Sequence, residues 1–241
     1  MQLAQRYPTA YDGIAIGAPA LYLSLAVPAM FWPQQVMNAL NRYPYGCELD
    51  ALTAAAIEAC DGLDGVVDGI VSDPDACLAA FDPFPLIGTP VPGCKEAGNV
   101  TVEIGTAAAV LVNTTWHGMI TPVGGKVWHG FAPGTNLVDA GGVPGVAATN
   151  CTGGACVGAP SDLALPWFTK FLAKDHPDFD VGSMTYQLFD DLVHYGRQVY
   201  RSAIDTDDPD LSRFRDAGGK MVSWHGLVSC SLVISLYGAV R

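Results

Sequence analysis

Positive charge is scarce in this sequence. Its 241 residues include 12 Lys and Arg against 24 Asp and Glu, which gives a formal net charge of −12. Nucleic acids and anionic membrane surfaces attract proteins that carry clustered basic side chains, and the sequence contains no basic stripe. We therefore expect no nucleic-acid partner and no membrane partner.

The sequence also lacks a long uninterrupted apolar stretch. Residues 13–41 carry no charge, but Gly17, Pro19 and Pro28 interrupt them. A membrane-spanning helix needs about 20 consecutive apolar residues, so we predict a buried strand followed by an irregular segment here. The first eight residues lack the basic and apolar regions of a signal peptide, and we expect the chain to start inside a longer protein.

No sequence motif for a catalytic nucleophile is present. The sequence lacks the Gly-x-Ser-x-Gly elbow, and none of its five histidines has an obvious nucleophile partner. His117 and His129 each occur in Trp-His-Gly, which is compatible with a phenolic pocket or with ordinary packing. His225 follows Trp224 in an expected strand, so a packed or hydrogen-bonded role is favoured for it.

Cysteines and glycosylation sequons, by contrast, are present together. Seven cysteines, with Asn-x-Thr sequences at Asn99, Asn113 and Asn150, indicate an oxidising compartment and a secreted protein. The odd number leaves at least one cysteine free or paired between chains, and Cys230 is the candidate.

Two pairs of cysteines are candidates for disulfides. Cys151 and Cys156 flank Thr-Gly-Gly-Ala, and we expect them to close a small surface loop. Cys47 and Cys94 could pair over a longer distance. Sequence alone leaves the connectivity open.

The densest chemical signal is the segment from Cys60 to Cys77, Cys-Asp-Gly-Leu-Asp-Gly-Val-Val-Asp-Gly-Ile-Val-Ser-Asp-Pro-Asp-Ala-Cys. Asp61, Asp64 and Asp68 are each followed by glycine. Calcium takes about six to eight oxygen ligands from carboxylates and backbone carbonyls, and glycine lets the chain curl enough to supply both. The spacing is not that of an EF-hand, so we predict a structural metal loop of another kind. The alternative is that the three Asp-Gly pairs are simply turns.

Both ends of the chain have the character of a parallel α/β sheet. Residues 1–8 predict the end of a helix and residues 13–17 a short apolar strand, while a helix at 211–217 precedes a strand at 219–225. Four aspartates before the second helix are expected to form a solvated loop that caps it: Asp205, Asp207, Asp208 and Asp210.

The long segment between these ends is of a different kind. Residues 48–60 predict an Ala-rich helix with one apolar face, which leads directly into the acidic loop. The composition of residues 81–160 favours irregular β structure, including a strand at Lys126–Phe131. Residues 165–203 return to helix, with a break near Pro177. The sequence thus predicts an α/β sheet domain that carries a large mixed insertion.

Four motifs together resemble the secreted tannase and feruloyl esterase family of fungi and bacteria. They are Ala-Gln-Arg-Tyr-Pro-Thr-Ala-Tyr-Asp-Gly-Ile-Ala-Ile-Gly-Ala-Pro-Ala at 4–20, the acidic loop at 60–74, Phe-Asp-Pro at 81–83 and Trp-His-Gly at 224–226. The resemblance implies an α/β-hydrolase serine esterase with a large lid inserted into its core. Residues 1–25 and 205–241 would then be parts of the core, and residues 26–204 the mixed α+β lid.

The resemblance also implies a calcium site and a function. Its ligands would be the carboxylates of Asp61, Asp64 and Asp68 with the backbone carbonyls of Val66 and Ile70, and a disulfide would join the two flanking cysteines. Members of the family cleave phenolic esters such as gallates or ferulates through a Ser-His-Asp triad and an acyl-enzyme.

The catalytic triad is where this sequence departs from the family. The family's Cys-Ser-x-Gly-Gly nucleophile motif would precede Met1, and the catalytic histidine would follow Arg241. Ser229 stands where the triad aspartate is expected, because the sequence runs His225-Gly-Leu-Val-Ser229. Two hypotheses follow: an incomplete carboxylic ester hydrolase, or a non-catalytic, calcium-stabilised lid or binding fragment. In either case we expect the chain as given to be inactive as an esterase.

Overall fold

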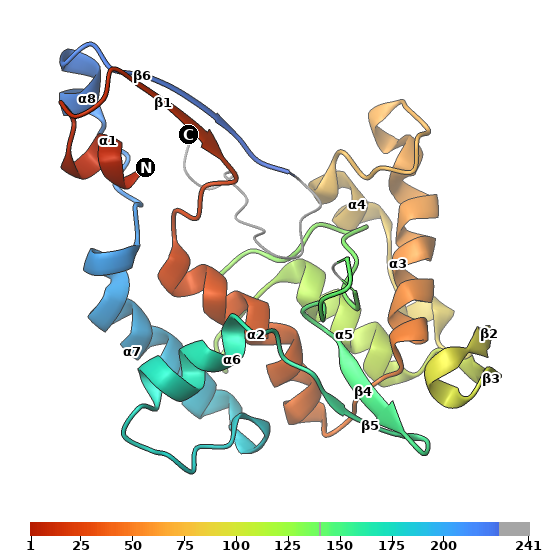
Figure 1. Cartoon of the computed structure of the whole chain (residues 1–241). Helices are drawn as coiled ribbons and strands as arrows, with labels where there is room; N and C mark the ends of the chain where they lie inside the picture. Colours follow the sequence, from red (N-terminus) through yellow and green to blue (C-terminus); the bar gives the residue numbers. More distant parts are fainter. Residues whose placement is uncertain (140, 227–241) are drawn as a thin grey trace.

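A computed structural model describes residues 1–139 and 141–226, and it places a small parallel sheet beside a larger helical body (Figure 1). Strands β1 (Gly13–Gly17) and β6 (Lys220–Trp224) pair in parallel, from Gly13 opposite Lys220 to Gly17 opposite Trp224. Helices α1 (Gln2–Arg6) and α8 (Ser212–Asp216) lead into these strands. The predicted α/β character of both ends is confirmed.

Helix α2 (Leu23–Leu40) runs through the centre of the helical body. The prediction of an irregular segment here was wrong, because the helix continues past both Pro28 and Pro33. A proline inside a helix costs about 3 kcal/mol, but nearly the whole of α2 is buried among other elements. Packing on all sides outweighs the local penalty.

Two buried glutamines on α2 hold distant backbone segments against it. The Gln34 Nε2 atom donates to the carbonyls of Val146 (3.3 Å) and Ala148 (3.0 Å), and Gln35 Nε2 donates to the carbonyl of Met184 (3.0 Å). Buried polar groups need such partners. In the described part of the chain, no helix is both long enough and apolar enough to cross a membrane.

Helix α3 (Gly46–Cys60) matches the prediction closely. Leu49 and Leu52 on its expected apolar face are completely buried. The buried carboxylate of Glu48 accepts hydrogen bonds from the backbone N–H groups of Tyr45 (2.9 Å) and Gly105 (2.8 Å). One side chain therefore caps α3 and also fixes the start of the next long helix.

That next helix, α5 (Thr106–His117), was not predicted. Its valines and threonines favour β structure, but Ala108, Leu111 and Val112 repeat at helical spacing and are fully buried. The predicted strand at Lys126–Phe131 is also wrong, since only an isolated bridge from Ile120 to Lys126 forms there.

Short hairpins and further helices complete the body. Antiparallel pairs form between β2 (Pro90–Cys94) and β3 (Val100–Glu103), and between β4 (Thr149–Thr152) and β5 (Ala155–Gly158). The helix predicted for residues 165–203 is interrupted, as expected. The remaining elements are α4 (Pro74–Ala80), α6 (Ala164–Pro166) with a π-helical turn at Trp167–Leu172, α7 (Tyr186–Ile204), and 3-10 turns at Asp61–Asp64, Phe84–Leu86, Lys95–Ala97 and Val181–Ser183.

Candidate metal centre

The acidic loop begins where α3 ends and is closed by a disulfide. The 3-10 turn Asp61–Asp64 follows α3 without a break, and Gly65 (φ +89°) and Gly69 (φ +80°) then turn the chain in the left-handed conformation. A bond between the buried Cys60 and Cys77 joins the two ends of the loop, as the resemblance implied. Without a side chain, glycine adopts these φ values at little cost.

The three predicted carboxylates organise the loop through local hydrogen bonds. Asp61 Oδ1 accepts from the backbone N–H groups of Asp68 (3.0 Å), Gly69 (2.8 Å) and Ile70 (3.2 Å). Asp68 Oδ1 in turn accepts from Ile70 N–H (3.0 Å). The loop therefore wraps around the side chain of Asp61.

Asp64 is held in the same local manner. Its Oδ1 atom accepts from the backbone N–H of Val66 at 2.8 Å. This bond, together with the side chain of Ser72, keeps the pKa of the Asp64 carboxyl below its usual value. Hydrogen bonds to the charged form of a carboxylate have this effect. Asp64 is thus presented to solvent as an anion.

The donor chemistry of this loop fits a hard cation. All of the predicted ligands are oxygens, and the backbone carbonyls of Val66 and Ile70 accept no hydrogen bond from the described residues. Their convergence is less complete. Within residues 1–139 and 141–226, the three ligand atoms of His, Cys, Asp or Glu side chains that lie within 4.8 Å of one another belong to residues outside this loop. A cation bound at this loop would have to draw the aspartates closer together.

That other set consists of Cys47, Cys94 and Glu96. Cys47 and Cys94 form a disulfide with a Cα–Cα distance of 5.6 Å, so their sulfurs are not free to bind a metal. Cys151 and Cys156 form a third disulfide. The disulfides expected at Cys60–Cys77 and Cys151–Cys156 are thereby confirmed, and the pairing that the sequence left open for Cys47 and Cys94 is formed. Cys230 lies outside the described residues.

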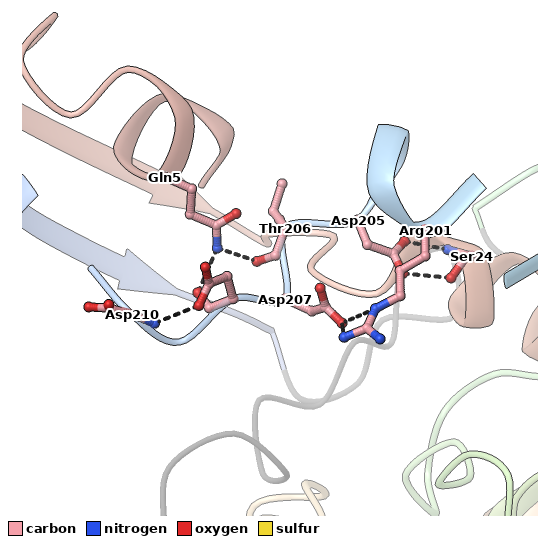
Figure 2. Close-up of polar contacts among 8 residues, drawn as sticks. Gln5, Ser24, Arg201, Asp205, Thr206, Asp207 and Asp210 are labelled. Carbon is pink, nitrogen blue, oxygen red and sulfur yellow. Dashed lines mark hydrogen bonds and ion pairs between the residues drawn. The ribbon is translucent and has the colours of Figure 1, made fainter. Parts of the chain in front are cut away.

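The second aspartate-rich segment differs from the solvated loop that its sequence predicts (Figure 2). Asp205 is only 5% exposed. Its carboxylate accepts hydrogen bonds from the backbone N–H (2.8 Å) and the hydroxyl (2.6 Å) of Ser24 at the start of α2. A carboxylate at a helix N-terminus satisfies a free N–H group and interacts favourably with the helix dipole. Asp205 thus caps α2 from the other end of the chain.

Further backbone and side-chain hydrogen bonds near Asp205 connect the N-terminal part of the chain to residues 205–208. Thr206 N–H donates to the carbonyl of Leu21 (2.8 Å). Gln5 Nε2 donates to the carbonyls of Thr206 (2.8 Å) and Asp208 (2.7 Å), as Figure 2 shows for the first of these. We call residues 21–24 and 205–208, with Gln5, the junction, because the chain passes here between the sheet and the helical body.

The other acidic residues of the segment have simpler roles. Asp207 forms an ion pair with the exposed Arg201, at 2.9 Å between Oδ2 and a guanidinium nitrogen. Asp210 Oδ1 accepts from the backbone N–H of Ser212 at 2.9 Å. The predicted capping of α8 is therefore confirmed for Asp210, and the prediction of a solvated loop is wrong for Asp205.

The two Trp-His-Gly sequences of the helical body pack directly against each other. A side chain added to Gly130 would meet the carbonyl oxygen of Trp116 at 1.8 Å, and one added to Gly118 would meet the carbonyl of Trp128 at 2.3 Å. His117 itself is exposed. This close approach of two backbones supports the packing interpretation of the motifs.

His129, in the second of these sequences, faces a pocket. It lines a narrow apolar hollow with Leu23, Met30 and Trp128, and its burial lowers its pKa. His225 follows β6, and its Nδ1 atom lies 2.7 Å from the carbonyl of Gly226. Ser229, which stands at the expected position of the triad acid, lies outside the described residues.

Comparison with known proteins places this chain. The family model described as tannase and feruloyl esterase matches residues 1–241. The chain belongs to the tannase and feruloyl esterase family. It is 34% identical to a probable feruloyl esterase from Arthroderma benhamiae over 224 residues, which are 93% of this chain and 39% of that protein. It is 27% identical to a tannase from Aspergillus oryzae, covering 94% of this chain and 43% of that protein.

A solved structure of this family has the same arrangement of elements. The tannin acyl hydrolase from Aspergillus niger matches with a TM-score of 0.83 and 28% identity, over 95% of this chain and 41% of that one. The predicted α/β class, of the α/β-hydrolase type, is confirmed at this level. The chain spans about two fifths of the length of these relatives.

Proposed function

We propose that this chain is the segment of a secreted carboxylic ester hydrolase that carries its lid. Residues 26–204 would form the lid, with residues 1–25 and 205–241 belonging to the α/β-hydrolase core. The junction supports these boundaries, because Ser24 and Asp205 bind each other where the chain enters and leaves the helical body. Three disulfides support an oxidising, extracellular location.

The reaction proposed for the whole protein is cleavage of phenolic esters, such as gallates or ferulates, through a serine acyl-enzyme. Membership of the tannase and feruloyl esterase family over the full chain carries this proposal. In serine esterases of this kind a histidine activates the serine, and an acidic residue orients the histidine.

In the described part of this chain His194 Nδ1 lies 3.7 Å from the carboxylate oxygen Oδ1 of Asp190, but no serine hydroxyl there is hydrogen-bonded to a histidine. Where a histidine ring nitrogen there has a hydrogen-bond partner, that partner is a backbone carbonyl, for example Asn113 for His117. A nucleophile without its base loses several orders of magnitude in rate. We therefore propose that residues 1–241 alone do not turn over esters, and that catalysis requires a serine and a histidine from elsewhere in the protein.

We further propose that the acidic loop binds Ca²⁺. The ligands would be the carboxylates of Asp61, Asp64 and Asp68 and the backbone carbonyls of Val66 and Ile70. The all-oxygen donor set and the left-handed glycines support this assignment. The role of the ion would be structural. It would fix the loop at the C-terminal end of α3 and would take no part in the chemical reaction.

A chimera tests the function of the chain. The matching segment of the tannin acyl hydrolase from Aspergillus niger is replaced by residues 1–241, with either Ser229 or Ser229→Asp, and hydrolysis of methyl gallate and methyl ferulate is measured. We expect the Ser229→Asp chimera to be faster by about 10³–10⁴-fold, which is the usual effect of a triad acid.

The outcomes separate the two functional hypotheses. Equal and measurable rates from the two chimeras would contradict the assignment of position 229. If both chimeras fold, bind the phenolic ester and fail to cleave it, the chain is the non-catalytic binding fragment instead. Circular dichroism and thermal melting establish that each chimera is folded.

A further inference from the structure

Three Asn-x-Thr sequences occur in this chain, and the structure places them in three different settings. N-linked glycosylation needs an asparagine amide and the hydroxyl two residues later, presented together on an accessible segment. The three acceptors are Asn99, Asn113 and Asn150, followed by Thr101, Thr115 and Thr152 respectively. Their surroundings differ in ways that affect how readily each asparagine can be glycosylated.

Asn113 is poorly placed for modification. It lies in the middle of α5 and is half-buried. The hydroxyl of Thr115 is fully buried and donates to the carbonyl of Leu111 at 2.6 Å. The hydroxyl that the acceptor sequence needs is therefore engaged in the core, and Asn113 itself is held in helical backbone.

Asn150 is exposed but constrained. It lies in β4, where each residue from Thr149 to Thr152 pairs with β5. The central residue of its acceptor sequence is Cys151, which is bound to Cys156 across the hairpin. Once this disulfide forms, the acceptor sequence is fixed in an extended strand and has no freedom to bend.

Asn99 is less restricted than either: the residue itself lies outside a strand, its acceptor sequence contains no disulfide, and only the two residues that follow it belong to β3, where Val100 is paired with Cys94. Asn99 lies in the turn between β2 and β3, with φ +63°, and is exposed together with Thr101. Among the described residues, the side chains of Asn99 and Thr101 have no hydrogen-bond partner. The Asn99 backbone N–H donates to the carbonyl of Cys94 at 2.8 Å. The turn projects from the edge of the helical body (Figure 1).

We propose that Asn99 carries an N-linked glycan and is the preferred acceptor of the three. The donor is an oligosaccharide linked to a polyprenyl diphosphate. The Asn99 amide nitrogen forms a bond to C1 of the sugar and its proton passes to solvent, while the bond from C1 to the diphosphate oxygen breaks and the polyprenyl diphosphate leaves with the electron pair. The inference depends on passage through a secretory compartment, which the disulfides indicate, and is independent of ester hydrolysis.

The test is site occupancy in the full-length protein secreted from yeast. Peptide mass spectrometry after enzymatic deglycosylation identifies occupied sites, because the enzyme converts the glycosylated asparagine into aspartate. We expect Asn99 to be occupied in most molecules, Asn113 in none and Asn150 in a minority. Thr101→Ala should remove the glycan at Asn99, whereas the matched variant Thr101→Ser keeps the acceptor sequence and should retain it.

A second pair of variants examines the hairpin. Replacing Cys151 and Cys156 together by serine keeps an Asn-x-Thr sequence at Asn150 but removes the constraint, and occupancy of Asn150 should rise. An unmodified Asn99, or occupancy of Asn113 or Asn150 equal to that of Asn99 in the unaltered protein, would overturn the proposal. The Thr101 variants leave the turn residue Asn99 in place, so that loss of the glycan is not a folding effect.

Discussion

Two segments of this molecule are rich in aspartate but use it in opposite ways. In the loop from Cys60 to Cys77 the carboxylates of Asp61, Asp64 and Asp68 bind backbone N–H groups at most nine residues away, and the loop faces solvent. At the junction, the buried carboxylate of Asp205 binds Ser24, which is 181 residues distant.

The two kinds of carboxylate differ in whether they keep their contact with water. The loop aspartates keep solvent access, so that they remain available to a cation, and their local bonds only shape the backbone. Asp205 has given up its hydration and depends on two hydrogen bonds to one partner. Because an unpaired buried charge is costly, the junction should respond far more strongly than the loop to loss of one aspartate.

The largest expected effect is therefore at Asp205. Asp205→Ala should lower the free energy of unfolding by about 3 kcal/mol, because it removes two hydrogen bonds to a charged group and leaves Ser24 N–H buried without a partner. Urea denaturation followed by circular dichroism measures the change.

Matched variants show whether the pair is responsible. Ser24→Ala removes only the hydroxyl contact and should cost less than Asp205→Ala, and the double variant should cost less than the sum of the two. If the two single effects simply add, the carboxylate and Ser24 do not act as a pair. If Asp208→Ala, in the same segment, costs as much as Asp205→Ala, the distinction between buried and exposed aspartates fails.

This contrast also explains how far the sequence predicts the structure. The acidic loop and its disulfide, helix α3, and the capping of Ser212 by Asp210 all depend on residues close together in the chain, and the sequence predicts them. The hydrogen bonds between Asp205 and Ser24 cannot be predicted from the local sequence, since nothing there distinguishes Asp205 from the three other aspartates of its segment. Only the folded backbone brings its partner near.

The two missed helices have the same physical cause. In α2, Pro28 lowered the expected helicity, and burial on every side compensates for it and for Pro33. In α5, valine and threonine favoured strands, and packing of a regularly spaced apolar face decides the outcome. In both cases tertiary contacts override a weak local preference, so that the sequence predicts fold class better than these individual elements.

The next effect in size concerns the proposed calcium loop. A ligand that binds only the folded state stabilises it by about 2.7 kcal/mol at a concentration 100 times its dissociation constant. The melting temperature should therefore rise with the logarithm of excess Ca²⁺ and fall again with EDTA. Asp61→Ala should abolish the response, because this carboxylate also organises the backbone N–H groups of Asp68, Gly69 and Ile70.

An aspartate outside the loop supplies the control. Asp210→Ala removes an exposed carboxylate that caps α8, so it should lower the melting temperature slightly and leave the Ca²⁺ dependence unchanged. A melting temperature that does not depend on Ca²⁺ in the unaltered protein would leave the three Asp-Gly pairs as turns only. An equal loss of response in both variants would point to a general effect of negative charge.

The smallest expected effect is at the ion pair of Asp207 with Arg201. The Arg201 side chain is 54% exposed and that of Asp207 13% exposed, and a guanidinium nitrogen lies 2.9 Å from Asp207 Oδ2. Because the arginine remains in contact with solvent, we expect the pair to contribute about 0.5 kcal/mol, as exposed ion pairs do, and salt to screen it. Asp207→Asn should therefore destabilise the protein slightly at low ionic strength and hardly at all in concentrated salt. A large effect that persists in salt would mean that Asp207, like Asp205, holds the junction together, and the division between the two kinds of aspartate would have to be redrawn.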